Sequence, residues 1–134
     1  MNATAGDHNG STPLHLAVQQ GSVDLASLLV EHGVNPTARD YDGSTPLHLA
    51  VRKGSVDLAR LLLKHGADPQ AQNYRGSTPL YLAVKPAKNE SMELTSLLIE
   101  HGASAIAKDN YGSIPLNLVL QGGREDLIRL LNRT

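Results

Sequence analysis

The amino-acid sequence predicts an all-α solenoid in which short helix-turn-helix units stack side by side. The segment GSTPLHLAV occupies residues 10–18 and again 43–51, a spacing of 33 residues. It returns as GSTPLYLAV at 76–84 and, after a step of 36 residues, as the altered GSIPLNLVL from Gly112. A leucine-rich stretch with helical spacing follows each copy. A period of this length is typical of stacked repeats, so we expect one domain over 1–134 with repeats 7–39, 40–72, 73–108 and 109–134.

The first helix of a unit is illustrated by the second copy. Thr45 can accept a hydrogen bond from a free N–H of the first turn, and Pro46 suits the first helical position because its missing N–H has no partner there. Gly54 is expected to end the helix. Between these limits one apolar stripe follows the i, i+3, i+4 spacing of an amphipathic helix; it consists of Leu47, Ala50 and Val51.

The second helix begins after this break. Ser55 can cap its N-terminus, and Asp57 lies in the first turn, where the helix dipole favours negative charge. His65 lies in the last turn, and Gly66 follows as the left-handed residue that ends the helix. The expected inner stripe, buried between units, consists of Leu58, Leu61 and Leu62. Neither helix is long enough to be stable alone, so each must bury its stripe against a neighbouring unit.

The full pattern resembles the ankyrin repeat. It reads Asp-x-x-Gly-x-Thr-Pro-Leu-His-Leu-Ala, then Gly, then Leu-Leu, then His-Gly-Ala-Asp, and the resemblance extends from Asp7 to about Arg133. It implies L-shaped units whose β-turn tips project from a stack of antiparallel helix pairs. It also implies that the protein binds other proteins, usually through the concave face formed by the tips and the first helices.

Two segments depart from this pattern. The third copy carries three additional residues within 85–91, where Pro86 should end the first helix and the chain should bulge from the stack. In the fourth copy Ile114, Asn117 and Val119 replace the usual Thr, His and Ala. Drift of this kind is expected in a terminal repeat, which has one face without a neighbour. Ile128, at a position that holds Ala or Thr in the other copies, is either exposed apolar surface or a local repacking.

The candidate binding surface follows from the positions that vary between copies. The first two copies differ at 11 of 33 positions, and five of the differences lie at the turn tips, the end of the first helix and the repeat junction, positions that line the ligand face in the ankyrin family. Tyrosines recur at the tips, where their rigid apolar rings suit protein interfaces, and basic residues lie nearby. We expect these residues to form a concave patch for a protein segment of acidic or polar character: Tyr41, Asp42, Arg52, Lys53, Tyr74, Arg75, Lys85 and Tyr111. The alternative is that the rings only pack along the turns as local covers.

The histidines have a structural explanation. His15 and His48 belong to the Thr-Pro-Leu-His segment, whose ring, by the family resemblance, forms hydrogen bonds across the turn. His32, His65 and His101 precede Gly at helix ends, where a cation complements the dipole. Because each type occurs once per unit, neighbouring rings should be too far apart to share a metal ion with bonds of about 2 Å.

Composition excludes several function classes. The 12 basic and 13 acidic residues give a net charge of −1, which is poorly suited to binding that depends on phosphate neutralisation. Without Cys there can be no disulfide or thiolate zinc site. No apolar run could cross a membrane, and no phosphate loop or nucleophile elbow is present. We therefore expect no nucleic-acid or membrane partner, no metal, no cofactor and no catalytic residue.

The sequence-based interpretation is thus a non-enzymatic protein-binding module for a partner of unknown identity. It would act as an adaptor or stoichiometric inhibitor, as a monomer, in the cytoplasm or the nucleus. One alternative is a structural, self-assembling repeat segment. Another is a targeting or regulatory domain of a larger protein.

Overall fold

Eight helices, arranged as four antiparallel pairs, make up the part of the chain that the structure describes. The computed structural model describes residues 10–84, 92–122 and 125–132, and those residues contain no β-strand. In order, the helices are α1 (Pro13–Gln20), α2 (Val23–Glu31), α3 (Pro46–Lys53), α4 (Val56–Lys64), α5 (Pro79–Val84), α6 (Met92–Glu100), α7 (Pro115–Gly122) and α8 (Glu125–Leu131). The predicted all-α solenoid is confirmed.

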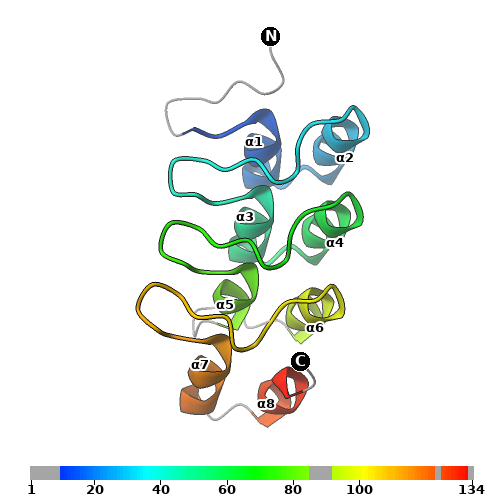
Figure 1. The fold of residues 1–134 in the computed structure, drawn as a ribbon. Coiled ribbons are helices and arrows are strands. Elements are labelled where there is room, and N and C mark those ends of the chain that lie inside the picture. Colours follow the sequence, from blue (N-terminus) through cyan, green and yellow to red (C-terminus); the bar gives the residue numbers. More distant parts are fainter. Residues whose placement is uncertain (1–9, 85–91, 123–124, 133–134) are drawn as a thin grey trace.

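The pairs stack in two parallel rows. One row holds α1, α3, α5 and α7, and the other holds α2, α4, α6 and α8 (Figure 1). Within the rows α1 packs on α3, α3 on α5 and α5 on α7, while α2 packs on α4 and α4 on α6. The loops between pairs extend past the first row and form a series of projecting turns on that side (Figure 1). We call these turns the tips.

Local chemistry sets the helix ends as predicted. The hydroxyl of Thr45 accepts the backbone N–H of His48, while the ring of His48 accepts the backbone N–H of Thr45 in return. Ser55 caps α4 by accepting the N–H of Leu58 at 3.2 Å. Gly54 separates the two helices with a φ of +73°, a left-handed conformation that a side chain would strain.

The same histidine also joins one repeat to the next. Nε2 of His15 lies 2.8 Å from the carbonyl oxygen of Ser44, and Nε2 of His48 lies 2.9 Å from that of Ser77. Both rings are fully buried. The expected hydrogen bond within the turn is therefore present, and it is accompanied by a second bond across the repeat junction. Tyr81 takes the equivalent position in the third repeat and so cannot reproduce this ring contact.

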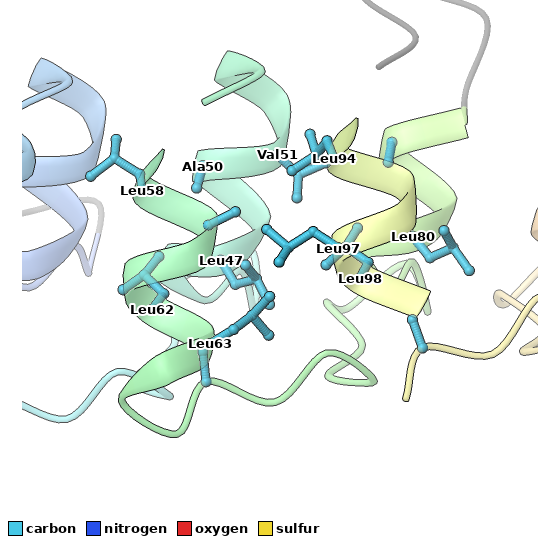
Figure 2. Close-up of a cluster of buried hydrophobic side chains, with 14 of the residues drawn as sticks. Leu47, Ala50, Val51, Leu58, Leu62, Leu63, Leu80, Leu94, Leu97 and Leu98 are labelled. Carbon is cyan, nitrogen blue, oxygen red and sulfur yellow. The ribbon is translucent and has the colours of Figure 1, made fainter. Parts of the chain in front are cut away.

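The core is a continuous layer of Leu, Val and Ala between the pairs. Figure 2 shows part of this cluster, with Leu47 and Val51 of α3, Leu62 and Leu63 of α4, and leucines of α5 and α6. The predicted stripe of the first helix is fully buried or nearly so.

The predicted stripe of the second helix was wrong in one member. Leu61 is only partly buried, and the buried side chains of α4 are instead Leu58, Ala59, Leu62 and Leu63. The inner stripe is wider than the i, i+3, i+4 pattern suggests because α4 packs against both its own partner helix and the neighbouring pairs. Leu61 lies at the edge of that contact.

The fourth pair departs from the others where its sequence does. Asn117, in place of the buried histidine, is exposed, and its N–H is bonded to the carbonyl of Ile114 at 3.1 Å. Ile128 is partly buried and packs against the core, so the repacking alternative is partly correct. The expectations for Pro86 and for the bulge at 85–91 lie outside the described residues.

Candidate protein-binding groove

A groove of about 700 Å³ lies between the tips of the second, third and fourth repeats and the first-row helices of the second and third. We call it the tip groove. Its walls come from the tips and from α3 and α5. The residues that line it are Tyr41, Asp42, Arg52, Asn73, Tyr74, Arg75, Ser77, Tyr81, Leu82, Asp109 and Tyr111.

One side chain at the start of each tip fixes the turn. Oδ1 of Asn73 accepts the backbone N–H groups of Arg75 and Ser77, both at 3.0 Å. Asp40 does the same for the preceding tip and Asp109 for the following one, with distances between 2.8 and 3.0 Å. Side chains of this kind hold their own backbone in a turn. The residue two positions later is thereby placed at the tip, and the three tip residues are Asp42, Arg75 and Tyr111.

Neighbouring tips are tied together by backbone hydrogen bonds. The N–H of Tyr74 donates to the carbonyl of Asp42 at 3.0 Å, and the N–H of Asn110 donates to that of Arg75 at 2.9 Å. The side-chain amide of Asn110 adds a bond of 2.7 Å to the carbonyl of Tyr74. The wall of the groove is therefore held in place in the free protein.

The tyrosine rings cover glycines of the preceding tip. Gly43 has a φ of +75°, and a Cβ added to it would lie 2.7 Å from Cδ1 of Tyr74. Gly10 stands in the same relation to Tyr41, at 2.5 Å. Both rings nevertheless remain largely exposed. Each ring thus packs on the preceding turn and also keeps a free surface towards solvent.

The groove carries unpaired charge of both signs. Among the described residues, the guanidinium groups of Arg52 and Arg75 have no ion-pair or hydrogen-bond partner, nor does the carboxylate of Asp42. Oδ1 of Asp109 is occupied by two N–H groups of its own turn. The groove thus offers two free cations, Arg52 and Arg75, and two carboxylates, Asp42 and Asp109, beside the aromatic rings.

Six of the eight predicted site residues line this groove. Lys53 does not: its Nζ donates to the carbonyl of Gln19 at 2.6 Å, near the C-terminus of α1. The long lysine side chain therefore completes a neighbouring helix end instead of facing a ligand. Lys85 lies outside the described residues.

Sequence reasoning missed Tyr81 and Leu82. Tyr81 replaces the buried histidine of the first two copies, and its ring is partly exposed in the groove. The change from GSTPLHLAV to GSTPLYLAV was a visible signal, because a phenol cannot repeat the two-ended contact of the imidazole. Asn73, Ser77 and Asp109 were missed because their polar atoms chiefly build the tips.

Other kinds of site find no support in the described part of the chain. No group of three or more His, Asp or Glu residues there could hold a metal ion. None of the helices described is long and apolar enough to cross a membrane.

The fold and the groove define a class of protein, namely a solenoid of helix pairs whose tips form one wall of a preformed groove. Comparison with protein families identifies the particular family. A family model for ankyrin repeats (3 copies) matches residues 1–73, and a model of the single ankyrin repeat matches residues 75–110. The chain belongs to the ankyrin repeat family. No curated protein matches the sequence. Ankyrin repeats generally serve as protein–protein interaction modules without enzymatic activity.

Proposed function

We propose that this chain binds a segment of a partner protein in the tip groove. The observation that carries the proposal is the gathering of four tyrosine rings and two unpartnered arginines in one groove across three repeats. Tyrosine and arginine are enriched among residues that dominate binding energy, because they combine rigid apolar area with directional hydrogen bonds. Most of the groove side chains are free to make such contacts.

The charges indicate the partner's chemistry. A carboxylate or another acidic group opposite Arg52 or Arg75 would gain a charge-assisted hydrogen bond, which is stronger than a neutral one. The free carboxylate of Asp42 favours a basic or hydroxyl group nearby. A segment with at least one acidic residue, flanked by polar groups and by an apolar side chain to lie on the tyrosines, fits this pattern.

The mechanism is rigid presentation. Because the tips are already held by backbone hydrogen bonds, binding orders little of the protein, and preorganisation of this kind raises affinity. All groove residues come from one chain, so a single copy is a complete binding unit. Such a molecule suits an adaptor or stoichiometric inhibitor, and we assign it to the cytoplasm or nucleus.

The test is capture of partners from a cell lysate with quantitative mass spectrometry, using a variant that changes only the groove. Arg52→Ala, Arg75→Ala and Tyr111→Ala are combined because these side chains make no hydrogen bond or ion pair within the described part of the chain, whereas Tyr41 and Tyr74 cover glycines. The matched control, Arg60→Ala with Lys64→Ala, removes two exposed cations from α4.

Captured proteins that are lost with the groove variant and kept with the control support the proposal. Equal capture by the groove variant and the parent would overturn it. Circular dichroism must show the same helix content in all three proteins.

A further inference from the structure

Both ends of the stack expose apolar side chains, and at each end one of them, Leu25 or Leu120, is buried at the equivalent position of the middle repeats. At the first end these are Leu16, Val23, Leu25 and Leu28 of α1 and α2. We call this set the N-terminal end face. At the other end they are Leu120 of α7 and, in part, Ile128 of α8. We call this pair the C-terminal end face.

The N-terminal end face is one half of an internal junction. Leu25 is 40% exposed, whereas Leu58 and Leu94 at the same position of the next two repeats are 0% and 1% exposed. The difference arises because α4 and α6 are covered by the preceding pair, while α2 has no preceding pair among the described residues. The first two copies share 22 of 33 residues, so the first repeat presents an internal surface to solvent. Terminal repeats usually carry a polar outer face.

The C-terminal end face is the other half of the same junction. Leu120 is 52% exposed, whereas Val51 and Val84 at the equivalent position are 5% and 2% exposed. Ile128 replaces residues that are fully buried in the earlier repeats, namely Ala26, Ala59 and Thr95. The larger isoleucine adds apolar area but also bulk, so a contact here should be weaker than an internal junction.

The two end faces carry opposite charges at the positions that form an ion pair across an internal junction. Across the internal junction of α4 and α6, Arg60 lies 3.8 Å from Glu93. At the free ends Arg129 stands at the position of Arg60 and Asp24 at the position of Glu93. If one end were placed on the other as in an internal junction, this pair of charges would meet.

We propose that a second copy of this chain docks end to end, with the C-terminal end face of one copy on the N-terminal end face of the next. The occupant is chosen because the chain itself supplies both halves of a junction that it already builds internally, with matching charge. Such a head-to-tail contact does not close on itself and therefore yields chains of copies whose length grows with concentration. The contact shares no residue with the tip groove, so each copy keeps its own binding site.

The test is analytical ultracentrifugation over a wide concentration range with Leu28→Glu and Leu120→Glu, each of which blocks one end. The parent should show a weight-average mass that rises with concentration, and each variant alone should remain a monomer. An equimolar mixture of the two variants should stop at a dimer, because each supplies one intact end. Ile106→Glu, which changes an exposed apolar side chain away from both ends, should assemble like the parent.

A parent that stays monomeric at every concentration would overturn the proposal and assign the end faces to a different occupant. Assembly of the single variants to the same extent as the parent would also overturn it. Asp24→Lys and Arg129→Glu test the register: each should weaken association by about twofold to fivefold, the range of an exposed ion pair, and their combination should restore it. Failure of the combination to restore association would overturn the docking arrangement. Leu28→Glu should capture partners from a lysate as the parent does. The outcome of the assembly test is therefore independent of the outcome of the groove test.

Discussion

Nε2 of His48 lies 2.9 Å from the carbonyl oxygen of Ser77, 29 residues further along the chain. The other ring nitrogen accepts the backbone N–H of Thr45 at 3.1 Å. A backbone N–H can only donate, so Nδ1 is the unprotonated nitrogen and Nε2–H donates to Ser77. One neutral imidazole thus caps its own helix and joins it to the next repeat.

Replacing His48 by Ala should destabilise the protein by about 2–4 kcal/mol, because two buried hydrogen bonds are lost and a cavity remains. Urea unfolding measures the difference. His65→Ala is the matched control: its Nδ1 lies 3.0 Å from the carbonyl of Leu61 in the same helix, and the ring is only partly buried. Its loss should cost about 1 kcal/mol or less. Equal costs for both variants would contradict the bridging role.

Stability should fall as pH drops below about 6.5. Burial lowers the pKa of His48 from 6.5 to about 4, with the charges of Arg52 and Arg39 acting in the same direction and the hydrogen bond to Ser77 opposing them. The unfolded chain then binds the proton more readily than the folded one. The contribution of neutral His48 to the free energy of unfolding is therefore fully present above pH 6.5. It is lost as pH falls towards 4, by up to about 1.4 kcal/mol per pH unit. Urea unfolding at several pH values should show that the free energy of unfolding depends less steeply on pH in His48→Gln than in the parent. An equal pH dependence in the two proteins would show that His48 is not its origin.

Replacement by Ala should destabilise the protein much more at Leu62 than at Leu61, although the two residues are neighbours in one helix. Leu62 is fully buried, and its replacement by Ala should cost about 2–5 kcal/mol. Leu61 is only partly buried, so the same change should cost about 1–2 kcal/mol. Thermal and urea unfolding of both variants check the order, and a larger cost at Leu61 would contradict the packing of α4.

Thr95→Val should stabilise the protein by about 1 kcal/mol. Thr95 is fully buried in α6, and its hydroxyl has no hydrogen-bond partner among the residues that the structure describes. Valine has nearly the same shape and removes the cost of burying that hydroxyl unpaired. Thr37→Val is the control, since that hydroxyl is exposed and donates to Asn35 at 2.7 Å. Stabilisation should appear in the melting temperature of the first variant and not in that of the second.

The sequence was informative where a local interaction decides the structure. Thr45, Pro46 and Gly54 set helix ends through their own backbone chemistry, and the tip tyrosines were visible as a periodic series. The sequence was less informative where the burial of a side chain depends on a helix of a neighbouring repeat. Helical spacing places Leu61 on the stripe of Leu58 and Leu62 and leaves Leu63 outside it, and only the positions of the neighbouring pairs bury Leu63 and leave Leu61 partly exposed. The length of the Lys53 side chain allowed it to reach a helix end in the preceding repeat, which no spacing reveals.

Site-specific photocrosslinking tests the groove account most directly. Benzoylphenylalanine in place of Tyr111 would lie at the tip groove, and the same group in place of Lys64 would lie on the exposed side of α4. The account predicts that the partner found by lysate capture crosslinks from position 111 and not from position 64. A crosslink from position 64 with none from position 111 would contradict binding in the groove.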